Sequence, residues 1–315
     1  MIDIKGEKFR VIDAHAHIWN KFGGKRFGTT PIEPLGFGMV KQGAEFYRML
    51  PPEYHDHQVP VEILLGYMDT VGIEKATILQ NPCYGDNRDY VRQVCTKYPG
   101  KFVSVGMLDP RNRDDVVHQM DILFNEYKCV GFKLEVPDVP FKMDAPEYEF
   151  LWKKINDMGA LVVLDLGWGD GPYDFNIKAF TSVMLKFPKM RTVLCHLGVS
   201  RLWDYSQPTP YPFLQKTLDL LDINQDNLFF DVSALQTCEP SLEYPFARCL
   251  DIFRTTVERC GIDRLMWGSD EPMILRHCTY KQTLTCFTKY ADFLTAAEWE
   301  KFLFGNAEKV YFQGN

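Results

Sequence analysis

The sequence lacks an apolar run long enough to cross a bilayer, which takes about 20 consecutive apolar residues. Residues 1–10 are polar and charged, so they do not form the apolar core of a secretory signal. We therefore expect a soluble, cytoplasmic protein that has no membrane partner.

The chain has nine cysteines but lacks a CxxC pair and any regular cysteine spacing. Closely paired cysteines are typical of structural zinc sites and redox motifs, and regular spacings are typical of disulfide frameworks in secreted domains. We therefore interpret the cysteines as buried or free thiols in a reducing compartment.

A basic stripe is also missing. The 35 Lys and Arg residues and the 42 Asp and Glu residues are spread along the sequence and give a formal net charge of −7. An acidic surface repels nucleic acid and anionic membranes, so we expect neither as a partner. The expected partner is a small acidic molecule, and assembly into a homodimer is left open.

Low-complexity linkers and internal repeats are absent as well, so nothing in the sequence divides the chain into smaller units. Its 315 residues suit one α/β barrel, for which about 250 residues is typical. We therefore treat residues 1–315 as a single domain.

What the sequence does contain is a repeated alternation of short, β-rich apolar runs with amphipathic helical runs. Apolar runs of this kind are typical of parallel strands that are buried on both faces. The candidate strands are 9–15, 75–79, 102–107, 130–134, 161–165, 192–196, 228–231 and 265–269. The candidate helices are 60–71, 114–127, 145–159, 175–187, 212–221, 246–261 and 280–290. Eight strands alternating with helices predict an α/β fold, a closed (β/α)8 TIM barrel.

One long irregular segment, 18–60, is rich in Gly, Pro and aromatic residues and follows the first strand. Segments of this length in a compact domain usually carry function or hide short elements. This one should lie at the C-terminal mouth of the barrel, where the active sites of barrel enzymes lie. We interpret it as an insertion that forms a lid or shapes the substrate pocket.

His15 and His17 lie two residues apart at the end of the first strand. Side chains two apart on a strand point to the same side, so both imidazoles should face the barrel axis. Two convergent neutral imidazoles suit a borderline divalent ion such as zinc. Taken alone, the pair is equally compatible with two histidines at a polar strand end that bind no ligand.

Two further polar residues end predicted strands at the same mouth. Asp270 follows the eighth strand, which adjoins the first in a closed barrel, so it should face His15 and His17. A lone Asp after a strand more often caps the next helix. His196 ends the sixth strand and is a candidate second-site ligand or general base, because a neutral imidazole can accept a proton from water.

Three segments carry a family resemblance. They are Ile12-Asp13-Ala14-His15-Ala16-His17-Ile18-Trp19, Cys195-His196-Leu197-Gly198 and Trp267-Gly268-Ser269-Asp270-Glu271-Pro272. Together they resemble the amidohydrolase-related family, in the branch that includes aminocarboxymuconate-semialdehyde decarboxylase, resorcylate-type decarboxylases and lactone hydrolases. The resemblance covers nearly the whole chain in motif order and strand spacing. It implies a distorted (β/α)8 barrel with one catalytic divalent ion, Zn or Mn.

By this resemblance His15, His17 and Asp270 are expected to be metal ligands. His196, with Asp270, is expected to be catalytic and to activate water or move a proton. The sequence departs from the family at the fifth strand, where most relatives have a metal-binding His and this chain has Asp165. We expect Asp165 to replace that histidine as a metal ligand, which would favour a harder ion such as Mn²⁺ over Zn²⁺. Alternatively, the site is weakened or metal-free, and Asp165 is an acid or base or binds a cationic group.

Lys133 ends the fourth strand and is expected to bind a substrate carboxylate or to lie in a polar layer of the barrel. Cationic and aromatic residues on the mouth loops could orient a planar, anionic substrate, although each is also compatible with an ordinary loop residue. They are Arg26, Trp168, Arg201, Trp203 and Arg276. A second HxH pair, His55 and His57, has no strand to align it, and we expect no metal there.

These observations favour a metal-dependent hydrolase, in which a metal-activated water attacks a small, carboxylate-bearing lactone or amide and His196 takes the proton. The alternative is non-oxidative decarboxylation of an aromatic or unsaturated acid, which uses the same motifs. The missing histidine of the fifth strand favours hydrolysis. A third hypothesis is a non-catalytic barrel that binds a small acid. The presence of His196 in addition to the metal motif argues against this hypothesis.

Overall fold

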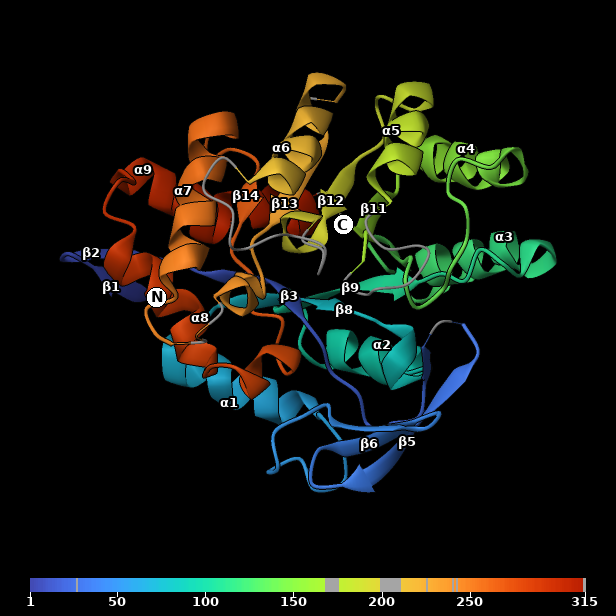
Figure 1. Ribbon diagram of the computed structural model, residues 1–315, viewed down its shortest axis with the longest axis horizontal. Coiled ribbons are helices and arrows are strands. Elements are labelled where there is room, and N and C mark those ends of the chain that lie inside the picture. Colours follow the sequence, from blue (N-terminus) through green and yellow to red (C-terminus); the bar gives the residue numbers. More distant parts are fainter. Residues whose placement is uncertain are drawn as a thin grey trace.

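Eight parallel strands form the central sheet of the computed structural model (Figure 1). The structure describes residues 1–26, 28–167, 176–198, 211–224, 226–239, 241 and 243–313. Neighbours in the sheet follow chain order, and the strands are β3 (Ile12–Ala16), β8 (Lys75–Leu79), β9 (Phe102–Met107), β10 (Gly131–Glu135), β11 (Leu161–Asp165), β12 (Thr192–Leu194), β13 (Leu228–Asp231) and β14 (Leu265–Met266). Each overlaps one of the eight predicted strands.

The sheet closes into a barrel between its first and last strands. Beyond the end of β14, Glu271 forms a parallel bridge with Ala16 of β3. Gly268 permits the close approach of the two segments, because a Cβ atom at this position would lie 2.8 Å from the Cβ atom of His15. The predicted (β/α)8 barrel is therefore confirmed.

Two strand ends differ from the prediction because the backbone turns sharply at the mouth. Strand β12 ends at Leu194, since His196 takes a left-handed φ of 56°. Strand β14 ends at Met266, and Asp270 beyond it has a φ of 64°. At the other end of the chain, the predicted strand 9–15 is divided, and β2 (Glu7–Phe9) pairs with β1 (Ile2–Ile4) in a separate hairpin.

Helices surround the barrel (Figure 1). They are α1 (Val61–Val71), α2 (Arg88–Lys97), α3 (Arg113–Asp121), α4 (Glu149–Met158), α5 (Ile177–Lys186), α6 (Pro212–Leu218), α7 (Ala247–Cys260), α8 (Tyr280–Tyr290) and α9 (Ala296–Glu300). All seven predicted helices overlap one of these, whereas α2 and α9 were not predicted. Local sequence sets several ends: α1 ends at Gly72, which has a φ of 89°, and Thr279 and Gln282 form a capping box at the start of α8.

The segment 18–60 is not the irregular loop that its composition suggested. It contains an antiparallel sheet of four strands, which we call the hairpin sheet: β4 (Lys25–Arg26), β5 (Thr30–Gly36), β6 (Met39–Gln42) and β7 (Glu45–Arg48). Gly43, with a φ of 61°, makes the tight turn between β6 and β7. In Figure 1, β5 and β6 lie to one side of the barrel, near α1 and α2. Whether this sheet acts as a lid stays a prediction.

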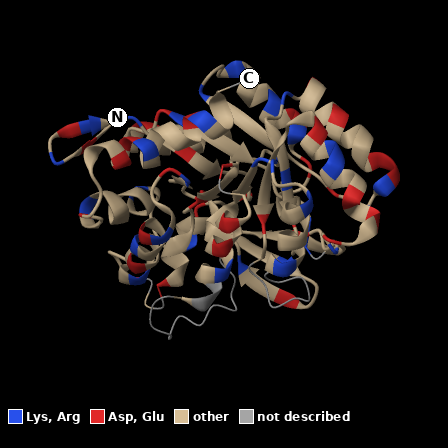
Figure 2. Cartoon of the chain, turned by 90° about the horizontal axis from the view of Figure 1, so that it is seen from above, with Lys and Arg blue, Asp and Glu red and all other residues tan. Residues whose placement is uncertain are grey.

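Acidic and basic residues are mixed on the side of the molecule that Figure 2 shows. In Figure 2, acidic and basic residues are interspersed along the outer helices. Among the residues that the structure describes, every helix is too short or too polar to span a bilayer.

Candidate active site

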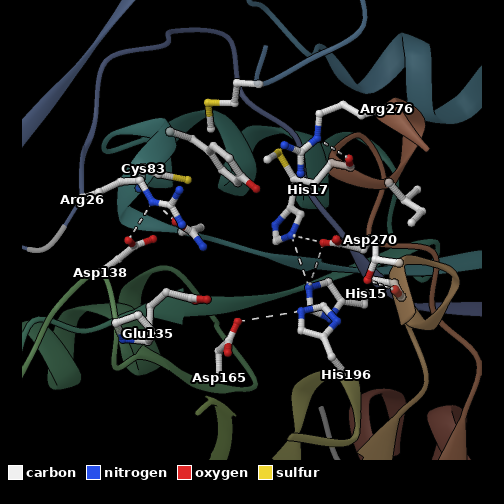
Figure 3. Close-up of a pocket in the computed structure, with 18 of the residues that line it drawn as sticks. His15, His17, Arg26, Cys83, Glu135, Asp138, Asp165, His196, Asp270 and Arg276 are labelled. Atoms are coloured by element: carbon white, nitrogen blue, oxygen red, sulfur yellow. Dashed lines mark hydrogen bonds and ion pairs between the residues drawn. The ribbon is translucent and has the colours of Figure 1, made fainter. Parts of the chain in front are cut away.

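A cavity of about 660 Å³ opens where the barrel strands end (Figure 3). Its volume lies within the range of about 300–1,000 Å³ that is typical of small-molecule sites. The barrel contributes all five residues that were predicted for catalysis or metal binding: His15, His17, Asp165, His196 and Asp270. The hairpin sheet contributes Arg26 and Tyr47 to the lining.

The rings of His15 and His17 converge, with their Nε2 atoms 3.2 Å apart. The Nδ1 atom of His17 lies 2.7 Å from the carbonyl oxygen of Leu79, and that of His15 lies 3.0 Å from the Asp231 carboxylate. Because a carbonyl or carboxylate oxygen only accepts, each Nδ1 carries the proton and each Nε2 presents a lone pair. Burial lowers the pKa of His15 to about 4, so this ring is neutral at pH 7.

Asp270 brings a third donor atom to the same point. Its Oδ1 lies 3.2 Å from Nε2 of His17 and 3.6 Å from Nε2 of His15. Two lone pairs and a carboxylate in this arrangement repel one another unless a cation lies among them. A tetrahedral ion with ligands at 2.0–2.2 Å separates those ligands by about 3.3–3.6 Å, which matches the observed spacing. The three residues therefore fit a divalent metal ion.

His196 lies beside this group, and its ring centroid is 4.7 Å from that of His15. Its Nδ1 lies 3.1 Å from the carbonyl oxygen of Ser233, so Nδ1 carries the proton and Nε2 is the basic nitrogen. That Nε2 lies 3.8 Å from Oδ2 of Asp165. These contacts put Asp165 next to His196 rather than among the three converging donors. Ligation by Asp165 stays a prediction.

Lys133 and Glu135 lie two residues apart on β10 and line the same part of the cavity. Both are buried, and Nζ of Lys133 lies 3.3 Å from Oε1 of Glu135. Burial raises the pKa of Glu135 well above its usual range. The sequence analysis missed Glu135, although the period of two along a strand, counted from Lys133, could have found it.

The cations predicted to bind substrate differ in their partners. Nε of Arg26 lies 3.0 Å from Oδ1 of Asp138, so Arg26, like Lys133, already has a carboxylate partner. Arg276, above His17 in Figure 3, lines the same cavity. Within the described part of the chain, no carboxylate oxygen lies within 4.0 Å of its guanidinium. Three other predicted mouth residues lie outside the described residues: Trp168, Arg201 and Trp203.

Asp231 is a second residue that the sequence analysis missed. It ends β13, one of the predicted strands, and is fully buried. Burial alone would raise its pKa, but its contacts with His15 and Ser233 hold the pKa below the usual range. Its position at the end of a predicted barrel strand was the available signal.

Comparisons with known proteins add to this geometry. A protein-family model described as Amidohydrolase matches residues 12–313. An amidohydrolase from Burkholderia multivorans with bound zinc has a similar structure, with a TM-score of 0.71 at 15% identity over 96% of this chain and 99% of that one. A probable 2-pyrone-4,6-dicarboxylic acid hydrolase from Acinetobacter baumannii, with citric acid bound, gives 0.65 at 16% identity over 96% and 99%.

A more distant similarity is to 2,6-dihydroxybenzoate decarboxylase from Rhizobium. It has a TM-score of 0.58 at 16% identity and covers 78% of this chain and 86% of that one. At such identities these structures show a common fold alone. A search of curated protein sequences gave no match.

Proposed function

Because this chain belongs to the amidohydrolase family and is an enzyme of that superfamily, we propose that it hydrolyses a small, carboxylate-bearing lactone or amide with one divalent metal ion as its cofactor. The observation that carries the proposal is the convergence of His15, His17 and Asp270, whose donor atoms lie 3.2 to 3.6 Å apart. When bound, such an ion supplies Lewis acidity and makes a coordinated water more acidic. Neutral imidazoles favour Zn²⁺, whereas an additional carboxylate from Asp165 would favour Mn²⁺.

His196 is the proposed general base. Its Nδ1 proton is engaged with Ser233, so Nε2 is the nitrogen that can accept a proton from the attacking water. Asp270, the proposed acceptor for the other hydrogen of that water, orients the attack. The proton on His196 is then available for the leaving oxygen or nitrogen, so that the base is restored after each turnover.

Arg276 is the proposed partner of the substrate carboxylate. Arg26 and Lys133 line the same cavity, but the carboxyl groups of Asp138 and Glu135 already lie 3.0 Å and 3.3 Å from them. A substrate carboxylate meets less competition at Arg276, where a bidentate pair with the guanidinium can form. Arg26, Lys133, Trp168 and Arg201 stay as proposed contacts to the rest of the substrate.

Metal analysis combined with a substrate panel tests this proposal. Purified protein is assayed for bound divalent ions, stripped with a chelator, and reloaded with Zn²⁺ or Mn²⁺. Each form is given lactones, N-acyl amides and aromatic acids, and the release of acid is followed. We expect about one ion per chain and turnover of a lactone or amide only in the reloaded forms. A stripped enzyme that is fully active would remove the metal from the proposal.

One observation favours decarboxylation as a second candidate. Glu135 is buried in the cavity wall, and its Oε2 has no hydrogen-bond partner among the described residues. In a non-oxidative decarboxylation the bond to the carboxylate carbon breaks, CO₂ leaves, and the electron pair left on carbon takes a proton, which Glu135 is placed to donate. The same panel separates the two reactions, because CO₂ release that depends on Glu135 and is lost in Glu135→Gln would favour decarboxylation.

A further inference from the structure

Asp231 lies between the two histidines to which the proposed function gives different tasks. One carboxylate oxygen, Oδ2, lies 3.0 Å from Nδ1 of His15. The other, Oδ1, accepts the backbone N–H of His196 over 3.0 Å and the hydroxyl hydrogen of Ser233. Both oxygens of Asp231 are therefore used inside the protein. This argues against a second metal site at Asp231, although His15, Cys195 and Asp231 bring three ligand atoms within 4.8 Å of one another.

Ser233 continues the chain of contacts from Asp231 to the His196 ring. Its Oγ lies 2.8 Å from Nδ1 of His196. Because the ionised Asp231 only accepts, the Ser233 hydroxyl donates to Asp231 and uses a lone pair to accept the Nδ1 proton of His196. The Ser233 carbonyl oxygen, 3.1 Å away, shares the same proton. The ionised Asp231 therefore decides which group donates and which accepts in each of these hydrogen bonds.

The consequence for both rings is the same. A proton on Nδ1 leaves Nε2 without one, and Nε2 is the atom that His15 presents to the converging donors and that His196 presents to the cavity. If Asp231 could not accept, His15 would be free to carry its proton on Nε2, which would block ligation. Asp231 thus acts on His15 directly and on the His196 ring through Ser233.

We propose that Asp231 and Ser233 form a hydrogen-bonded relay that holds His15 in the form that binds metal and His196 in the form that accepts a proton. Both are positioning residues, since neither has a contact with the cavity point where the donors converge. This inference rests on the proposed function. The relay is asymmetric: Asp231 supports both histidines, whereas Ser233 supports mainly His196.

Two substitutions separate the two branches of the relay. Asp231→Asn keeps the shape but turns one acceptor into a donor, so it should disturb both histidines. Ser233→Ala removes only the hydroxyl, whose Oγ lies 2.8 Å from Nδ1 of His196 and 3.2 Å from Nδ1 of His15, and His15 keeps Asp231 as its nearer partner. Ser104→Ala is the matched control, because Ser104 is buried like Ser233 but lies on β9 and contacts Cys129 over 3.5 Å.

Zn²⁺ affinity is measured first, by competition with a chromophoric chelator, so that this readout does not depend on turnover. We expect Asp231→Asn to bind Zn²⁺ about 10–100-fold more weakly, the usual cost of removing a partner behind a metal-binding histidine. Ser233→Ala and Ser104→Ala should bind within about two-fold of the parent protein. Circular dichroism and thermal melting establish that each variant is folded.

Kinetics at saturating Zn²⁺, on the best substrate of the panel, test the second branch. Ser233→Ala should lose about ten-fold in kcat with KM unchanged, a fraction of the 10²–10⁴-fold that a positioned base contributes. Folded Asp231→Asn with parental Zn²⁺ affinity would overturn the relay, as would Ser233→Ala with parental kcat. If Asp231→Asn does not fold, the Ser233→Ala pattern decides. A parent protein that binds neither Zn²⁺ nor Mn²⁺ defeats the proposed function itself, whereas one that binds either ion leaves the relay to these variants, measured with that ion.

Discussion

The chain contains two HxH pairs, and they have opposite environments. At the end of β3, His15 and His17 converge with their Nε2 atoms 3.2 Å apart, and each Nδ1 has an acceptor. In the segment between the hairpin sheet and α1, His55 is exposed and its ring packs edge-on against Phe37, with centroids 4.4 Å apart. The ring of His57 is buried and packs against Phe22, with centroids 5.3 Å apart, and neither of its nitrogens has a hydrogen-bond partner in the described ranges.

Backbone conformation accounts for this difference. In extended backbone, residues two apart face the same side, and the barrel strands β8 and β13 supply fixed acceptors behind both rings, Leu79 and Asp231. His57 has a left-handed φ of 58°, which breaks that period, and the two rings of the second pair pack against different residues, Phe37 and Phe22. An HxH motif therefore becomes a donor pair only when a strand aligns it and partners fix its tautomers.

Removing one ring from each pair gives the largest expected contrast. His17→Ala deletes one of three converging donors, so we expect Zn²⁺ affinity to fall by more than the roughly 10–100-fold that the loss of an outer partner costs, with a parallel loss of turnover. His55→Ala should leave both unchanged. Chelator competition and steady-state kinetics on the two variants measure the contrast. Equal losses of Zn²⁺ affinity and turnover in His17→Ala and His55→Ala would mean that the pair on β3 does not bind the metal ion more strongly than the second pair.

Asp165 is intermediate between a metal ligand and a residue outside the site. It lies at the end of a barrel strand, at the same mouth as His15, but its carboxylate contacts His196 and not the converging donor atoms. Asp165→Asn keeps the size of the side chain and removes its charge. We expect turnover to fall more than Zn²⁺ affinity does, since Oδ2 lies 3.8 Å from Nε2 of His196 and outside the three converging donors. The ratio of the two losses is the measurement. A loss of Zn²⁺ as large as that in His17→Ala would instead identify Asp165 as a ligand.

The barrel could be predicted from the sequence because strands that are buried on both faces consist of continuous apolar residues. Such runs can be recognised without knowing which distant residues are in contact. It placed His15, His17, Asp165, His196 and Asp270 at one mouth by the same logic, and the cavity lining agrees. The hairpin sheet was not predicted because its strands are short and largely exposed, so they lack continuous apolar runs.

Partners behind the site were harder to find than the site itself. An Asp at a strand end has many ordinary uses, and only the three-dimensional contact between Asp231 and His15, 216 residues apart, distinguishes it. The pairing of Arg26 with Asp138, across 112 residues, is likewise invisible in the sequence, so it predicted Arg26 as a substrate contact without its carboxylate partner. Residue types and their spacing along a strand indicate which side chains can be metal ligands. The tautomer of a histidine and the pairing of a charged side chain depend on contacts between distant residues, which form only when the chain folds.

The smallest expected effect concerns the second pair and the pH dependence of stability. Burial lowers the pKa of His57 in the folded chain. In the unfolded chain the pKa of a histidine is about 6.5, so somewhat below this pH the unfolded chain binds a proton at His57 that the folded chain does not. The unfolded state then binds more protons as the pH falls below about 6.5, and His57 makes the fold less stable there. Above that pH the ring is neutral in both states and adds no pH dependence.

His57→Phe tests this sign with a ring that does not titrate and that still packs against Phe22, whose centroid lies 5.3 Å from that of His57. We expect the melting temperature of the parent to drop between pH 7.5 and pH 5.5 by a few °C more than that of the variant. Any strain from the left-handed φ cancels, because it is present at both pH values. His55→Ala, which changes an exposed ring, should behave like the parent. An identical drop in the parent and His57→Phe would mean that His57 is charged or hydrogen-bonded in the folded protein. The two HxH pairs would then differ only in that a strand aligns the first pair.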